Sequence, residues 1–196
     1  MKYINQREYA HIPYTTDLAT EGIAPEGTKN NIKSRGCGLC CLAMAVDILT
    51  DKVLGLEEAV SLSEANRANL GRGTNLNIMG PIVAEKFGLS YSATSDLDEA
   101  IAHLSAGGVI VAHMGAPEGK DIGLFAKIGH YILLVSTDGK DFCILDPDYT
   151  PTKFTIPERA GRVDTSHLPF LYASVSDVDA ETKPGRVKYH MLARKR

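Results

Sequence analysis

The sequence lacks long apolar runs, an apolar N-terminal segment and an excess of basic residues. Its longest unbroken apolar run extends only from Leu39 to Val46, whereas a membrane-spanning helix needs about 18 or more such residues. The first segment, MKYINQREYAHIPYTTDL, has no apolar core of the kind found in secretory signal peptides. A formal net charge of −3 over 196 residues argues against a broad nucleic-acid-binding surface. We therefore expect a soluble protein without membrane or nucleic-acid partners.

Cysteine is scarce, and three of the four cysteines crowd into the stretch SRGCGLCCLAMAV. This distribution does not resemble an extracellular disulfide framework, so we expect a cytoplasmic protein, with export by another route left open. A structural zinc site usually takes ligands from two C-x-x-C pairs, and only one such pair, Cys37 and Cys40, is present. A thioredoxin-like redox pair would follow a strand, but Gly-, Ser- and Lys-rich sequence precedes this one. We expect neither a metal nor an organic cofactor.

The order of sequence patterns predicts an α+β fold. No repeat or break in composition divides the chain, so we expect one domain over residues 1–196. After an irregular arm with a short strand at 3–6, helical patterns occupy 37–49, 56–70, 76–87 and 96–105. β-branched and aromatic-rich segments follow at 109–114, 130–136, 141–146, 153–156, 170–175 and 186–192. Helices first and strands second favour a buried N-terminal helix packed against an antiparallel sheet.

Among the crowded cysteines, Cys37 is the candidate nucleophile. Cys40 and Cys41 lie inside an apolar helix and are expected to pack as small hydrophobic side chains. Cys37 instead stands between Gly36 and Gly38 at the helix start. Unpaired backbone N–H groups and the helix dipole stabilise a thiolate there, and the small neighbours leave room for a substrate.

A cysteine nucleophile needs an imidazole base and a third group that orients the base. His130 begins a strand directly after a glycine-rich loop, at the mouth of any cleft, and Asp146 ends the next strand. His113, at the end of another strand, is the weaker alternative base. The sequence therefore predicts that His130 is the base for Cys37 and that Asp146 orients His130.

Whether His130 and Asp146 meet depends on the turn between their strands. A three-residue turn over Thr137-Asp138-Gly139, with Gly139 left-handed, pairs residue 136 with 140 and sets His130 opposite Asp146 on one face of the sheet. A two-residue turn of Asp138-Gly139 places them on opposite faces. The sequence permits either register, and only the first brings the two side chains together.

Five segments carry a resemblance to a known family: INQREYAHIPY, NIKSRGCGLCCLAMAVDIL, GTNLNIMGPIVAEKFGL, VIVAHMG and GLFAKIGHYILLVSTDGKDFCILDPD. Together they resemble the papain-like cysteine peptidases, in particular the bacteriocin-processing (double-glycine leader) peptidase-like family. The resemblance implies a papain-like fold with the thiolate at Cys37, the general base at His130 and the orienting carboxylate at Asp146. It also implies a glutamine that donates to the oxyanion. Gln6 is the match, and Asn31, nearer in the sequence, is the alternative donor.

These residues and the resemblance predict a thiol hydrolase that cleaves a peptide or amide bond through an acyl-enzyme. Its partner would be a peptide or protein substrate. Two alternatives stay open. The same acyl-enzyme could pass its acyl group to an amine or thiol instead of water, or the fold could serve as a catalytically silent peptide-binding module.

Overall fold

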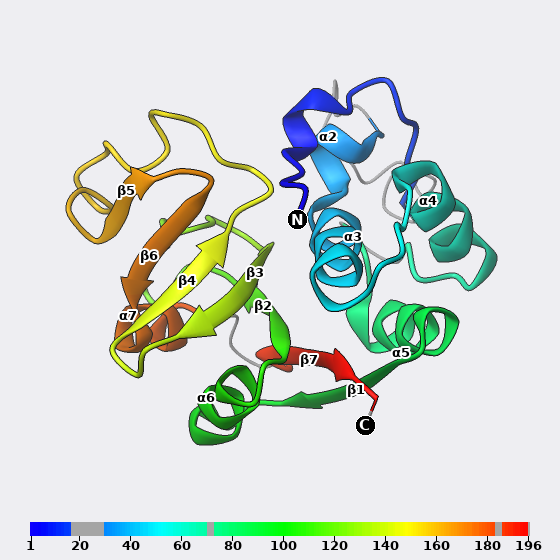
Figure 1. Ribbon diagram of the computed structural model, residues 1–196. Helices are drawn as coiled ribbons and strands as arrows, with labels where there is room; N and C mark the ends of the chain where they lie inside the picture. Colours follow the sequence, from blue (N-terminus) through cyan, green and yellow to red (C-terminus); the bar gives the residue numbers. More distant parts are fainter. Residues whose placement is uncertain (17–29, 70–72, 183–185, 196) are drawn as a thin grey trace.

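The computed structural model describes residues 1–16, 30–69, 73–182 and 186–195 (Figure 1). Its helical segments are η1 (Gln6–Glu8), α2 (Ile32–Arg35), α3 (Cys37–Leu49), α4 (Leu56–Ala65), α5 (Leu76–Phe87), α6 (Leu97–Ser105) and α7 (Val175–Ala180). Its strands are β1 (Leu89–Thr94), β2 (Val109–Met114), β3 (His130–Thr137), β4 (Asp141–Leu145), β5 (Val163–His167), β6 (Phe170–Ser174) and β7 (Tyr189–Arg194). Helices predominate before β2 and strands after it, as the sequence predicts.

The strands form one antiparallel sheet in the order β1-β7-β2-β3-β4-β6-β5. The strand β3 lies at the centre, between β2 and β4. Its first residue, His130, pairs with Met114 of β2. The backbone at His130 is therefore fixed by the sheet ladder rather than carried on a free loop.

Alternate side chains of the central strands enter two separate hydrophobic clusters. Val111 and Leu133 pack with the buried residues of α3, α4 and α5. Ile110 and Ile132 face the other way and pack with residues of α6 and α7. Figure 1 shows α3, α4 and α5 gathered on one side of the molecule, opposite the strands β3 to β6. Helices thus cover both faces of the sheet.

The helix α3 is buried along nearly its whole length and has the bounds predicted from the sequence. Only Cys37, Asp47 and Ile48 of its residues are not buried. Gly36 ends α2 and also begins α3, and a Cβ added there would lie 2.7 Å from Ile32 Cγ2. This close junction holds Cys37 at the partly exposed end of a buried helix. Within the described ranges, no helix combines the length and the apolar character needed to cross a membrane.

The N-terminal arm does not contain the strand predicted at residues 3–6. The Asn5 side chain accepts a hydrogen bond from the Arg7 N–H at 3.1 Å and starts the short helix η1 at Gln6 instead. The Gln6 N–H donates to the Pro147 carbonyl at 2.7 Å, which ties the arm to the segment after β4. Residues 17–29 of the arm lie outside the described residues.

Other differences from the predicted elements occur where the chain is polar. Residues 153–156, predicted as a strand, form turns in which the Lys153 N–H donates to the Thr150 carbonyl at 3.0 Å. The strands β1 and β5, which were not predicted, occupy the two edges of the sheet. Their sequences are largely polar because an edge strand is less enclosed, and so they give little strand signal. The helix α4 ends at Ala65, short of the predicted Leu70.

Candidate active site

A cleft of about 420 Å³ opens at the N-terminal end of α3. Its walls come from η1, α2, the loop before β3 and the segment after β4. Gln6, Cys37 and His130 line it, and Asp146 lies beside His130, fully buried. The structure therefore brings together all four residues singled out from the sequence.

Cys37 differs from the other three cysteines in its exposure. It is partly exposed at the cleft, whereas Cys40, Cys41 and Cys143 are buried. Burial, and to a smaller extent the neighbouring Cys37, raises the pKa of the Cys40 and Cys41 thiols well above the usual range. The prediction that Cys40 and Cys41 pack in the core is confirmed. Cys37 is the thiol that a ligand in the cleft can reach.

His130 is held between the Cys37 thiol and a carboxylate. Its Nε2 lies 2.7 Å from Asp146 Oδ1, within the expected hydrogen-bonding range, and the Cys37 side chain lines the same cleft as its ring. Burial and the positive charge of Lys153 both lower the pKa of His130. The charge of Asp146, the hydrogen bond to Asp146 and, to a smaller extent, the neighbouring Cys37 side chain have a larger effect, and together they raise the pKa of His130 to about 9. The imidazole is therefore protonated at neutral pH.

Lys153 is a site residue that the sequence analysis missed. Its Nζ lies 2.6 Å from Asp146 Oδ2, and the two side chains are 7% and 0% exposed. Burial alone would raise the pKa of Asp146, but the charges of Lys153 and His130 hold it well below its usual range. Asp146 stays ionised, with a separate cation at each oxygen. The sequence shows that a lysine follows Asp146 closely. Because residues 153–156 were predicted to form an extended strand, this lysine was not expected to fold back onto Asp146.

Gln6 lies in the cleft wall with Cys37 despite their separation in the sequence. Its side-chain Nε2 donates to the Lys33 carbonyl at 2.8 Å, and its backbone is fixed by Pro147. A carboxamide carries two N–H hydrogens, so the bond to Lys33 leaves the second for a ligand. Asn31, the alternative donor, caps α2 through the Ser34 N–H at 3.1 Å and donates to the Ala10 carbonyl at 3.0 Å. The amide of Asn31 is thus engaged in holding α2.

The predicted register of the β3–β4 hairpin is wrong. Residue 136 does not pair with 140; instead Thr137 pairs with Phe142. The Asp138 side chain accepts hydrogen bonds from the Lys140 and Asp141 N–H groups, both at 2.8 Å. These local bonds widen the turn beyond the three residues expected. Gly139 does adopt the predicted left-handed conformation, with φ of +89°.

A β-bulge at Val135 places the His130 and Asp146 side chains on the same face of the sheet. Ser136 pairs with Cys143, but the next pair along β3 is Leu134 with Ile144, so Val135 is an extra residue. Because side chains alternate along a strand, the register of the turn alone would put His130 and Asp146 on opposite faces. The extra residue reverses that outcome, and the two side chains meet.

The other buried or partly buried histidines are engaged elsewhere. The His113 ring stacks on the Tyr131 ring, with centroids 4.5 Å apart. His190 is buried, its Nδ1 lies 2.8 Å from the Tyr91 hydroxyl, and burial lowers its pKa to about 4. His103 Nε2 lies 2.9 Å from the Leu192 carbonyl oxygen. None of the three lines the cleft, so His130 is the imidazole beside Cys37.

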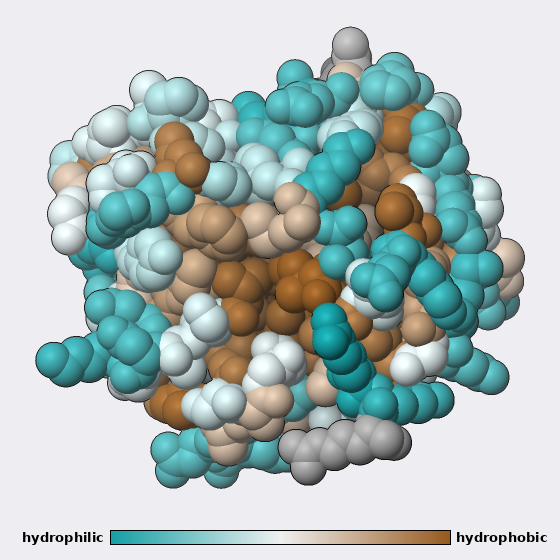
Figure 2. Space-filling view, viewed as in Figure 1, coloured by the Kyte–Doolittle hydropathy of each residue, from teal (hydrophilic) through white to brown (hydrophobic). Residues whose placement is uncertain are grey.

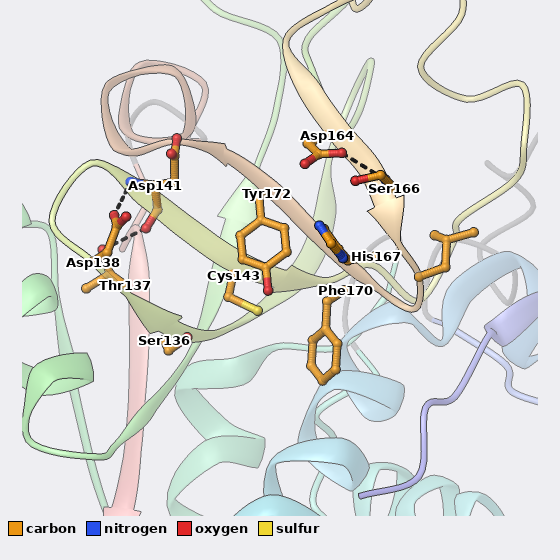
Figure 3. Close-up of a pocket in the computed structure, with 11 residues that line it drawn as sticks. Ser136, Thr137, Asp138, Asp141, Cys143, Asp164, Ser166, His167, Phe170 and Tyr172 are labelled. Carbon is orange, nitrogen blue, oxygen red and sulfur yellow. Dashed lines mark hydrogen bonds between the residues drawn. The ribbon is translucent and has the colours of Figure 1, made fainter.

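A second hollow, of about 810 Å³, lies over β4, β5 and β6 (Figure 3). Cys143 and His167 line it, but Figure 3 shows the Cys143 sulfur beside Tyr172. The His167 ring meets the Tyr172 ring edge-on, with centroids 6.0 Å apart. Figure 2 shows apolar side chains gathered between these strands and α3, with polar side chains around them. In the hollow over β4 to β6, Cys143 and His167 each lie beside Tyr172, so they do not form a thiol–imidazole–carboxylate set like the one at Cys37.

The chain matches solved structures in fold, although no family model and no curated protein sequence matches it. One matching crystal structure is described as a C39-like peptidase from Bacillus anthracis, with a TM-score of 0.56 and 12% sequence identity. The match covers 95% of this chain and 97% of that chain. The predicted α+β fold, a papain-like arrangement of a buried helix on an antiparallel sheet, is confirmed.

Proposed function

We propose that this protein is a cysteine peptidase or amidase, a thiol hydrolase that acts on a peptide or protein. The observation that carries the proposal is the connected set Cys37–His130–Asp146. In that set the accessible thiol and the imidazole line one cleft, the thiol helps to raise the pKa of the imidazole, and the imidazole Nε2 lies 2.7 Å from a buried carboxylate. The fold shared with a C39-like peptidase supports a peptide as the substrate class.

The first chemical step is attack on the carbonyl carbon. With a pKa of about 9, His130 is an imidazolium, and an imidazolium next to a cysteine stabilises the thiolate, which is the nucleophilic form of that side chain. As the C–S bond forms, the carbonyl oxygen gains negative charge. The Cys37 N–H, at the first position of α3 and without an intrahelical acceptor, and Gln6 Nε2 are the donors that stabilise this oxyanion.

Collapse of this intermediate breaks the C–N bond. The His130 imidazolium protonates the leaving amine, which departs and leaves a thioester on Cys37. Neutral His130 then removes a proton from a water molecule that attacks the thioester, and the acid product leaves with the thiolate restored. Asp146 remains ionised throughout and stabilises the imidazolium form of His130.

Alkylation with iodoacetamide at mildly acidic pH (about 6) tests the proposal, because only an activated thiolate reacts rapidly there. We expect fast modification confined to Cys37, and cleavage of peptides by the unmodified protein. Slow alkylation of every thiol would overturn the proposal in favour of a silent binding module. Product analysis without any added acceptor separates the remaining alternative. A hydrolase turns over with water alone and releases free acid, whereas turnover that requires an added amine or thiol would overturn hydrolysis as the reaction.

A further inference from the structure

The cleft around Cys37 is basic, although the chain as a whole has a net charge of −3. Its lining includes five cationic side chains: Arg7, Arg35, Lys127, Lys153 and Arg159. Among the described residues that line it, Asp148 is the one acidic side chain. The larger hollow over β4 to β6 has the opposite character, since three aspartates line it and no described lysine or arginine does. The positive charge is therefore concentrated where the reaction is proposed.

Two of these cations are already neutralised. Lys153 Nζ pairs with Asp146 at 2.6 Å, and Arg7 Nε lies 2.7 Å from Asp148 Oδ1. Of the remaining three, Arg35 is buried and already engaged by a partner. Arg159 and Lys127 are left: over the part of the chain that the structure describes, neither forms an ion pair with a carboxylate.

Arg159 is 8% exposed, and backbone carbonyls hold it in the cleft wall. Its Nε donates to the Gly123 carbonyl at 2.9 Å and its Nη1 to the Lys153 carbonyl at 3.2 Å. A guanidinium carries five N–H groups in a rigid plane, so these two bonds fix its orientation and leave donors for a ligand. A buried cation held in this way binds a carboxylate through charge-assisted hydrogen bonds.

Lys127 is exposed on the loop that precedes His130. The loop is held by a bond within itself and by a buried side chain: the Gly123 N–H donates to the Ala126 carbonyl at 2.9 Å, and Phe125 is buried. Because Arg159 also binds the Gly123 carbonyl, the segment that carries Lys127 is attached directly to Arg159. The two cations therefore belong to connected parts of the wall of the cleft that Cys37 also lines.

We propose that the substrate of the Cys37 site carries a carboxylate next to the bond that is cleaved, and that Lys127 and Arg159 bind it. The inference rests on the proposed function, because it names the substrate class of that same site. An Asp or Glu side chain and a free C-terminal carboxylate share the required chemistry. A substrate with Lys or Arg at the same place would meet like charge in the cleft and be rejected.

Capture from a synthetic library of short peptides by the full chain carrying Cys37→Ala tests the inference without requiring turnover. One arm of the library has amidated C-termini and the other has free ones, which separates the two sources of the carboxylate. We expect peptides with Asp or Glu, or with a free C-terminus, to be enriched about tenfold or more over those with Lys or Arg. That ratio corresponds to one charge-assisted hydrogen bond. Added salt should reduce the enrichment.

A charge reversal in the cleft provides the specific control. Lys127→Glu in the Cys37→Ala background should abolish the enrichment. Lys140→Glu makes the same change of charge in the exposed turn between β3 and β4 and should leave the enrichment intact. Equal loss in both variants, no enrichment, or enrichment of basic peptides would overturn the inference.

Cleavage of the same library by the unmodified chain separates this inference from the proposed function. Cleavage without a preference for acidic peptides would leave the hydrolase standing and remove the inference. Enrichment of acidic peptides without any cleavage would support the binding chemistry and remove the hydrolase.

Discussion

Lys153 and His130 bind opposite oxygens of one buried carboxylate, at 2.6 Å from Asp146 Oδ2 and 2.7 Å from Asp146 Oδ1. The arrangement gives Asp146 two tasks. It orients the imidazole beside Cys37, and it neutralises a lysine whose side chain is 7% exposed. Removing the carboxylate should therefore disturb both the chemistry and the fold, and the two effects can be separated by mutation.

Replacing Cys37 should remove reactivity without unfolding the protein. Because Cys37 is partly exposed at the end of α3, Cys37→Ala should abolish rapid alkylation and peptide cleavage, with the circular dichroism spectrum and urea midpoint unchanged. Cys40→Ala and Cys41→Ala, both in the core, should keep rapid alkylation and cost about 1 to 3 kcal/mol of unfolding free energy. Rapid alkylation that persists in Cys37→Ala would show that another thiol is the nucleophile.

Asp146→Asn should lower kcat/KM by roughly a hundredfold or more, because an amide stabilises the imidazolium less. It should also cost about 3 to 5 kcal/mol in urea unfolding, since Lys153 is left as a buried, unpaired cation. The double variant Asp146→Asn with Lys153→Met removes that cation. It should recover most of the lost stability and none of the lost turnover. Recovery of turnover in the double variant would contradict the role given to Asp146.

Lys153 should set the alkaline limit of activity. The proposed mechanism needs protonated His130, whose pKa is raised from an ordinary 6.5 to about 9, so kcat/KM should be retained below about pH 9 and lost above it. Burial and Lys153 both lower this pKa, so Lys153→Met should move the alkaline limb to higher pH. Lys153→Arg, which keeps the charge, should leave it near pH 9. A limb that does not move in Lys153→Met would limit Lys153 to a structural role.

Gln6 and Asn31 should differ in which property they affect. Gln6→Ala removes a proposed oxyanion donor and should lower kcat by about a hundredfold to a thousandfold, with a smaller change in KM. Asn31→Ala removes the cap of α2 and should cost about 0.5 to 2 kcal/mol of unfolding free energy, with kcat nearly preserved. The opposite pattern would assign the oxyanion contact to Asn31.

The sequence is most informative where side-chain pattern and local structure agree. Both ends of the helix α3 could be predicted, because an apolar run begins after Gly36 and polar sequence follows Leu49. Cys37 stands out for the same reason, since it lies at the start of that run. The polar edge strand β5 and the short helix η1 could not be placed, because pairing with β6 and the side chain of Asn5 determine them.

In the candidate site too, the sequence pattern predicts some features, and others depend on contacts that form only on folding. The two strand patterns indicated that His130 and Asp146 lie near each other, but the turn on which their meeting was predicted to depend is not the one formed. They meet because of the bulge at Val135, which the sequence pattern does not reveal. Asp138 forms local hydrogen bonds that no pattern of apolar residues reveals. Lys153 could not be found, because it reaches Asp146 only after turns fold the chain back. The catalytic roles of Cys37, His130, Asp146 and Gln6 stay predictions.

Because of the bulge at Val135, the two strands that carry His130 and Asp146 should differ in how well they tolerate the deletion of a residue. Val135 is surplus to the ladder, so a chain that lacks it can form a regular hairpin in which Leu134 and Ser136 keep their partners on β4. His130 and Asp146 would still share a face, and Cys37 should stay reactive. The strand β4 contains no extra residue of this kind. Deletion of Cys143 would either place the Asp146 side chain on the other face of the sheet or shift Asp146 along β3 by about 3.3 Å for each residue of register. Chains related to this one should therefore vary in length within β3 and keep β4 constant.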